Sequence, residues 1–380
     1  MVTPHMASRP TARQASLLAA EFPLILGIAL TLLFWLVFPN WFVAPEASPA
    51  RSSILFGGLF LSILWCAFSV VRHADCLAIL LGEPLGTIIL TLAVIGIEVT
   101  MIATVMLTGE ANPELGRDTM FAVLMLVMNG LVGITLLVGG LRHHEQVFNF
   151  RGANAYLSVI IPLAVLGLIL PRYSAATSDA SASLLLSIFL IAMCVVLYVV
   201  FLGVQTLRHR KHFTQPDAED EDHAHDVPGV LRSVPFHAVL LVATMVPVVL
   251  LSKKLAVLMD VGVETLNAPP AIAGVVVAVL VLTPEGVAAI RSAMHNQLQR
   301  GINICLGSAL ATIGLTIPAV ILVGMITGLG VQLGLPRQEE LLLMMTLLLS
   351  TVTFASGRTG ILQGVVHLVV CLAWLTLIFD

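Results

Sequence analysis

Long apolar runs separated by short polar turns make up most of the chain. A run of roughly 17 or more apolar residues can cross a bilayer as a helix, and we accept shorter runs where clear turn residues bound them. On this basis the pattern predicts eleven membrane helices, at residues 22–38, 54–71, 85–107, 120–141, 156–170, 184–204, 234–251, 271–290, 302–329, 341–354 and 360–379.

The one long polar stretch lies at 208–232, where the segment PDAEDEDHAHD carries six acids within eleven residues. A segment so poor in apolar residues predicts a solvated linker. One span and then five precede this linker, and five follow it. Because five is odd, duplicated units would enter the membrane from opposite faces as inverted repeats, an architecture typical of secondary transporters.

The predicted fold is therefore an all-α integral membrane protein of about 11 transmembrane helices, one N-terminal helix plus two inverted five-helix repeats. Its predicted parts are the N-terminal tail and first helix at 1–43, the first repeat at 51–206, the acidic linker at 207–233 and the second repeat at 234–380.

Composition excludes several other classes of protein. Hydrophobic residues make up 58% of the chain and charged residues 11%, which is too little polar surface for a soluble globule. The net charge of −4, with no basic stretch, argues against a nucleic-acid partner. The five cysteines stand singly in apolar runs and are interpreted as small buried side chains. Membrane lipids are the expected surroundings.

Basic residues predict the orientation. With the N-terminus inside, 12 of the 18 Lys and Arg residues fall in inside loops and 6 in outside loops, the latter including Lys253 and Lys254. This bias favours a cytoplasmic N-terminus and linker, an outside C-terminus and a location in the cell (inner) membrane. The run at 22–38 is long enough to stay as a span, which we favour over a signal peptide.

Two apolar spans each contain a single carboxylate, Glu98 in the third span and Glu285 in the eighth. A carboxylate at mid-bilayer depth costs a few kcal/mol unless a proton, a cation or a partner neutralises it. If the two acids face each other, they would hold one cation or two protons on the same oxygens and would titrate together. A structural polar contact is the alternative for each acid taken alone.

Polar residues near the acids are candidate secondary ligands. Thr283 and Pro284 are expected to interrupt the eighth span and free carbonyl oxygens. Asn129, Ser308 and Thr312 lie in the spans that follow the acids, where packing between helices is an equally good explanation.

Candidates for gating or pH sensing lie at the predicted cytoplasmic ends of spans: His73, Asp75, Glu83, His295 and Asn296. The imidazoles titrate near neutral pH. Interfacial contact with headgroups and water is the alternative for all of them. In the linker, His223 and His225 among acids would allow loose metal binding, although a solvated spacer is the simpler interpretation.

Several motifs carry a family resemblance: VVRHADCLAILLGEP, GIEV around Glu98, LVGGLRHHEQVFN, LTPEG around Glu285, and MHNQLQRGINICLGSALATIGLTIP. These segments resemble the calcium/cation exchanger superfamily, most closely its bacterial ChaA-type calcium/proton and sodium-potassium/proton antiporters. The resemblance implies two repeats whose acids bind the ion alternately with protons, and an acidic cytoplasmic loop between them. By position those acids are Glu98 and Glu285.

One departure from the family pattern bears on selectivity. The usual repeat is GNxxE, with an Asn three residues before the acid, whereas this chain has Ile95 and Leu282 there. Two oxygen ligands expected for Ca²⁺, which takes six to eight, are missing. This difference gives weight to a monovalent Na⁺ or K⁺ activity.

The sequence thus predicts a secondary cation/proton antiporter that exchanges protons for Ca²⁺ and also for Na⁺ or K⁺, with little calcium transport as the alternative. A passive cation channel and an intramembrane enzyme are less favoured classes, since the chain has no HExxH, GxSxG or GxxxxGK[ST] motif. No cofactor is expected beyond the transported ions. The cation preference, the stoichiometry and the oligomeric state stay open.

Overall fold

The computed structural model describes residues 17–38, 49–82, 85–106, 113–174, 182–216, 231–328 and 330–380. Within these ranges the protein is a bundle of helices with one antiparallel pair of two-residue strands, β1 (Gln146–Val147) and β2 (Arg358–Thr359). Glu83 and most of the acidic linker, including His223 and His225, lie outside the described residues.

All eleven predicted spans correspond to helical segments in the described part of the chain. Eight of them are long and apolar enough to cross a membrane. The segments are α2 (Phe22–Leu32), α3 (Pro49–Leu81), α4 (Leu85–Met106), α5 with α6 (Leu115–Met125 and Val132–His143), α7 (Phe150–Ala164), α8 (Leu184–Gly203), α9 (Val234–Leu266), α10 (Ala271–Met294), α11 with α12 (Leu298–Ala311 and Ile317–Thr327), α13 (Arg337–Thr353) and α14 (Ile361–Ile378).

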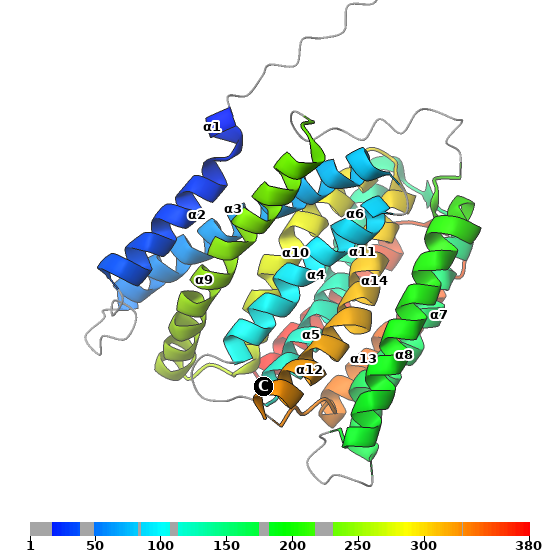
Figure 1. The fold of residues 1–380 in the computed structure, drawn as a ribbon. Coiled ribbons are helices and arrows are strands. Elements are labelled where there is room, and N and C mark those ends of the chain that lie inside the picture. Colours follow the sequence, from blue (N-terminus) through cyan, green and yellow to red (C-terminus); the bar gives the residue numbers. More distant parts are fainter. Residues whose placement is uncertain are drawn as a thin grey trace, which may run out of the picture.

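These residues form helices because lipid offers no partner for backbone N–H and C=O groups, and a helix satisfies them internally. In Figure 1, α2, α3 and α9 lie at one edge of the bundle and α7 with α8 at the other, while α4, α10 and α11 lie between them. Large apolar side chains such as Leu185, Val196 and Leu348 are exposed on the outer surface, as expected where lipid replaces water.

The repeats can be followed element by element. The first consists of α3, α4, α5 with α6, α7 and α8, and the second of α9, α10, α11 with α12, α13 and α14. Each acid lies in the second helix of its repeat. The third helix of each repeat contains a π-helical turn, η2 (Leu126–Leu131) or η7 (Thr312–Thr316).

Two helices run further than the hydrophobic pattern predicts. The polar cluster after Val71 does not end a helix, because α3 continues to Leu81 with Arg72 and Asp75 inside it. Likewise α9 continues to Leu266, so Lys253 and Lys254 lie in a helix and not in a loop. The polar side chains are accommodated by neighbouring helices, as when Arg72 donates to Glu21 at 2.9 Å.

The expected break at Thr283 and Pro284 is absent, because α10 is continuous from Ala271 to Met294. Proline removes one backbone donor from a helix, and in the same turn the Thr283 hydroxyl donates to the carbonyl oxygen of Val279 at 2.6 Å. The irregular backbone lies instead in the π-helical turns, which often occur at functional sites.

Candidate functional site

Glu98 lies in the middle of α4 and is 2% exposed. Thr312 donates from its hydroxyl to Oε2 of Glu98 at 2.9 Å, and Thr316 donates to Oε1 at 3.2 Å. Both threonines belong to η7 and are completely buried. The π-helical turn of the second repeat therefore supplies a hydroxyl to each oxygen of the acid of the first repeat.

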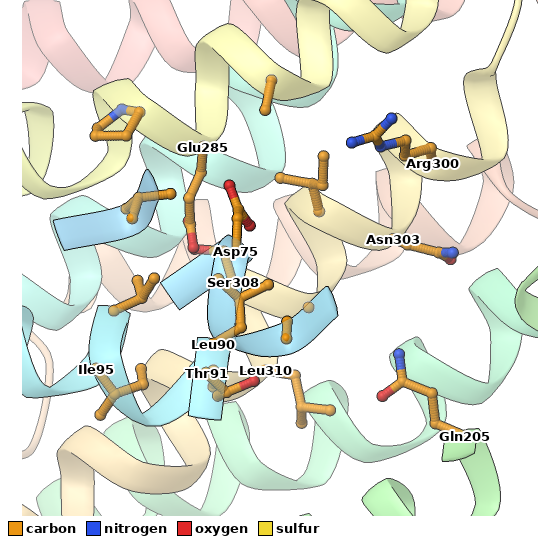
Figure 2. A pocket seen from close by; sticks show the side chains of 18 of the residues that line it. Asp75, Leu90, Thr91, Ile95, Gln205, Glu285, Arg300, Asn303, Ser308 and Leu310 are labelled. Atoms are coloured by element: carbon orange, nitrogen blue, oxygen red, sulfur yellow. The ribbon is translucent and has the colours of Figure 1, made fainter. Parts of the chain in front are cut away.

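Glu285 has a different environment. It lies in α10 and is half-buried, and among the described residues none donates a hydrogen bond to its buried Oε2. Its carboxylate points toward Ser308 and Asp75 (Figure 2). Glu98 and Glu285 are close enough for their charges to interact. The two acids therefore lie within range of each other's charge but have unequal hydrogen bonding.

A cavity of about 370 Å³ opens beside Glu285. Its wall includes residues of α3, α4, α8, the π-helical turn η5 (Val204–Arg208), α10 and α11, among them Asp75, Thr91, Gln205, Arg300 and Asn303. Glu98 is not among the described residues that line this cavity. Glu285 is thus accessible from the cavity, whereas Glu98 lies behind it.

The cavity lies toward one end of the bundle, which we call the linker end. This end carries β1, β2 and the short helix Arg210–Phe213 that follows α8, and it is at the top of Figure 1. Asp75 lies near the last turn of α3 and Arg300 in the first turn of α11. The mouth of the cavity is therefore beside the segment that leads into the acidic linker.

The opposite end, the far end, is closed at the start of α5. There the guanidinium of Arg117 donates to Asp118 at 2.8 Å, to Glu114 at 3.0 Å and to the carbonyl oxygen of Gly334 at 3.2 Å. The backbone of Thr119 lies 3.1 Å from the position that a Cβ of Gly274 would take. A side chain at Gly274 would force the neighbouring backbone to shift by a few tenths of an ångström, so the glycine favours this close approach of α10 to α5.

Asn129 does not point freely toward the acids. Its amide nitrogen donates to Thr346 at 2.8 Å, and its Oδ1 is 3.2 Å from Nδ1 of His367, whose Nε2 is 3.0 Å from the hydroxyl of Thr353. These side chains are buried. This chain of polar contacts was not predicted from the sequence, although a histidine inside an apolar span was the available signal.

The predicted gating residues divide into separate groups. Asp75 lines the cavity. His295 is exposed, and its Nδ1 lies 2.8 Å from the carbonyl oxygen of Arg291. Asn296 accepts from the side chain of Gln146 at 3.0 Å.

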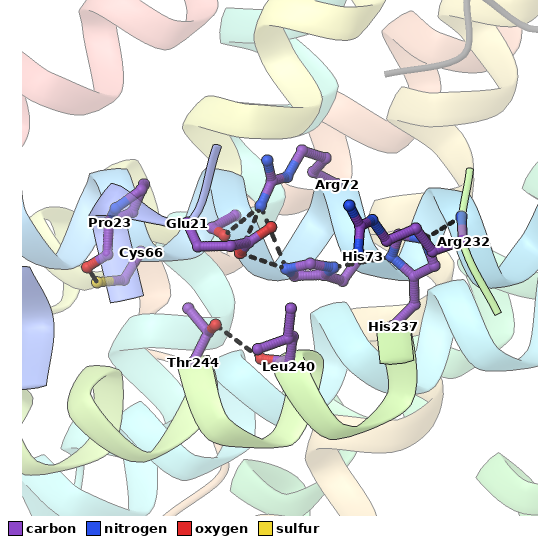
Figure 3. A network of polar contacts seen from close by, with 10 residues as sticks. Glu21, Pro23, Cys66, Arg72, His73, Arg232, His237, Leu240 and Thr244 are labelled. Atoms are coloured by element: carbon purple, nitrogen blue, oxygen red, sulfur yellow. Dashed lines mark hydrogen bonds and ion pairs between the residues drawn. The ribbon is translucent and has the colours of Figure 1, made fainter. Parts of the chain in front are cut away.

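His73 belongs to a polar network that joins α2, α3 and α9 (Figure 3). Its Nδ1 lies 3.0 Å from Nδ1 of His237, and its Nε2 lies 3.1 Å from Glu21 and 3.2 Å from Arg72. The backbone N–H of Arg232 donates to Nε2 of His237 at 3.1 Å.

These contacts fix the proton positions when both rings are neutral. Since Nε2 of His237 accepts, its proton must be on Nδ1, which then donates to Nδ1 of His73. The proton of His73 is consequently on Nε2 and points to Glu21. A further proton on either ring would place two N–H donors face to face.

Comparison with known proteins gives consistent matches. The family model for the sodium/calcium exchanger protein matches residues 51–207 and 236–379, one range in each half of the chain. The chain is 40% identical over 323 residues to the sodium-potassium/proton antiporter ChaA of Escherichia coli (strain K12), covering 84% of this chain and 87% of the relative.

Two solved structures have the same fold. The structure of native YfkE superposes with a TM-score of 0.72 at 19% identity, covering 95% of this chain and 99% of the other. The H⁺/Ca²⁺ exchanger CAX superposes with a TM-score of 0.67 at 14% identity, covering 94% and 88%. The similarity extends over both repeats.

Proposed function

Because the chain belongs to the sodium/calcium exchanger family and is a secondary cation/proton antiporter, we propose that Glu98 and Glu285 form the site where cation and protons compete. The observation that carries this proposal is the unpartnered Oε2 of Glu285. A buried carboxylate oxygen without a donor is costly, and either a proton or a cation removes that cost.

The oxygens around the acids support binding of a cation. Thr312 and Thr316 hold Glu98 by their hydroxyls, and Ser308 lies beside Glu285. These three hydroxyls take the place of the two amide oxygens that the family pattern would supply at Ile95 and Leu282. With four carboxylate oxygens they provide a site of hard oxygen ligands, the kind that Ca²⁺ and the alkali cations prefer.

Na⁺ and K⁺ are the transported cations that the comparisons favour, because the relative at 40% identity is a sodium-potassium/proton antiporter. Ca²⁺ is the second candidate, since two carboxylates can balance its charge. Thr283 is a weaker ligand candidate than Ser308, because its hydroxyl donates to a carbonyl of its own helix.

Transport proceeds by alternating access in this proposal. With the N-terminus and linker cytoplasmic and the C-terminus outside, the cavity at the linker end opens to the cytoplasm. A cation or protons from that side reach Glu285 first, past Asp75 and Arg300, and Glu98 completes the site. The charged, empty site resists the change to the outward-open state, which prevents uncoupled leakage.

Substitution of the acids tests the site. Glu98→Gln and Glu285→Gln should each abolish proton efflux from inverted membrane vesicles on addition of Na⁺, K⁺ or Ca²⁺, because the neutral amide cannot exchange a proton for a cation. Glu145→Gln is the matched control, since Glu145 is 69% exposed. Normal exchange by either variant, at equal protein level in the membrane, would rule out the proposed site.

A further inference from the structure

The two repeats place an aspartate and an arginine at matched positions. Asp75 is the 27th residue of the 33-residue helix α3, and Asp260 is the 27th of the 33-residue helix α9. Arg300 is the third residue of α11, and Arg117 is the third of α5. Because the repeats are inverted, these matched positions lie at opposite ends of the bundle.

The pair at the linker end belongs to an open mouth. Asp75 and Arg300 both line the cavity that reaches Glu285, and the charge of Arg300 acts on Asp75. In Figure 2 their side chains lie on the same side of Glu285. The cavity separates α4 from α11 here, so solvent reaches the arginine.

The arginine at the far end is in the opposite state. Arg117 is 6% exposed, and its three contacts join the start of α5 to the segment before α13 through the carbonyl of Gly334. Its hydrogen bonds to Asp118 and Glu114 are charge-assisted, which makes them stronger than neutral ones. The carboxylate of Glu339 also faces this charge.

The helices α4 and α10, which carry the two glutamates, also have residues at matched positions. Thr91 lies seven residues before Glu98 and lines the open cavity. Ala278 lies seven residues before Glu285, one turn after Gly274, and is completely buried in the core cluster that contains α5. The same relative position is therefore open in one repeat and closed in the other.

We propose that Arg117 is the gate residue of the far mouth. Its bond to the Gly334 carbonyl holds the start of α5 to the segment before α13, and its bonds to Asp118 and Glu114 fix the guanidinium where α5 packs on α10 at Gly274. Release of Arg117 from them opens the path along Ala278 to Glu285, and Arg117 then takes the relation to Asp260 that Arg300 has here to Asp75. The inference rests on the proposed function only in assuming one site reached from both ends.

The gate also links opening to charge. When Arg117 leaves, Asp118 and Glu339 lose a counter-charge in a region of low dielectric, which is unfavourable. A cation that enters from the far end compensates them. Arg117 thus acts as a positioning residue that favours opening when a cation is present.

Accessibility of an engineered cysteine tests the gate. In a background where the five native cysteines are replaced, Thr91→Cys and Ala278→Cys serve as matched probes for the two mouths. A charged, membrane-impermeant thiol reagent is added to right-side-out and inverted vesicles. With Arg117 intact, the Thr91→Cys probe should react from the linker side and the Ala278→Cys probe slowly from either side.

Arg117→Gln should raise the reaction rate of the Ala278→Cys probe from the far side about tenfold, because charge-assisted hydrogen bonds are lost. Arg117→Lys should restore most of the protection. The Thr91→Cys probe should react no faster than before, and slower if the far-open state gains population.

Arg172→Gln is the matched control, since Arg172 is also at the far end and donates to the neighbouring carbonyl of Leu335 at 2.9 Å. This substitution should leave the Ala278→Cys probe protected. An unchanged rate in Arg117→Gln would overturn the gate, and so would a rise at both probes, which indicates general loosening. The assay needs no transport, so its failure is distinct from failure of the glutamate site.

Discussion

Two glutamates in equivalent spans have unequal environments in this protein. Both oxygens of Glu98 accept a threonine hydroxyl, whereas Oε2 of Glu285 has no donor among the described residues. A donor stabilises the ionised carboxylate, and a missing donor leaves room for a proton or cation. We therefore expect Glu285 to receive the ion first and Glu98 to hold it.

A change at Thr312 tests the contribution of the hydroxyls. Thr312→Val keeps the shape of the side chain but removes the donor to Glu98, so the apparent KM for the transported cation should rise about tenfold, the order expected for one hydrogen bond to a charged group. Cation-dependent proton flux in vesicles measures it. Thr351→Val is the control, because the Thr351 hydroxyl donates only to a carbonyl of its own helix. A KM equal to that of the control would contradict the assignment.

At the scale of elements, the ends of α2, α3 and α9 are joined by one polar network. His73 and His237 fit it only as neutral rings, with Glu21 and Arg72 on one side and the backbone of Arg232 on the other. Since α3 forms part of the cavity wall, this network links the packing of the linker end to the protonation of two imidazoles.

The network predicts a pH-dependent stability. With both rings neutral, the bonds from the Arg232 backbone to His237, from His237 to His73 and from His73 to Glu21 are all made. Their stabilisation is present above the histidine range, about pH 6.5, and is lost as pH falls through it. The apparent Tm in detergent should therefore fall between pH 7.5 and 5.5, and this fall should be smaller in His73→Gln and His237→Gln. His295→Gln, at an exposed histidine, should behave as wild type. Equal pH dependence in all four proteins would exclude the network as its cause.

In the whole molecule, the two ends of the bundle differ although the two repeats are similar. The linker end is open as far as Glu285, while the far end is closed by Arg117 and by α10 packed on α5. Exchange of these two arrangements between the repeats would move access to the site from one end to the other, with little change inside each repeat.

A single shared site predicts competition between protons and cations. Lowering the pH on the linker side should raise the apparent KM for Na⁺, K⁺ or Ca²⁺ while the maximal rate stays nearly constant, because protons occupy the same carboxylate oxygens. Flux measurements over a series of cation concentrations at several pH values measure this. A falling maximal rate at constant KM would indicate separate proton and cation sites.

The amino-acid sequence was sufficient to predict the membrane location, the eleven spans, the repeat and the two intramembrane acids. These follow from the local pattern, since lipid requires long apolar helices and makes an isolated carboxylate costly. Local patterns failed at the ends of α3 and α9 and at Pro284, where polar side chains or a proline suggested a break. At α3 the polar side chain of Arg72 found a partner in a neighbouring segment, and α10 stayed continuous through its proline.

Which side chains meet could be seen only in the folded protein. Thr312 bonds to Glu98 across 214 residues of sequence, His73 meets His237 across 164, and Arg117 reaches Gly334 across 217. No local pattern encodes such pairs, because they depend on how the two repeats pack against each other. The same packing decides which end of the bundle is open. Because the helices follow the same order in both repeats, that order is compatible with an opening at either end.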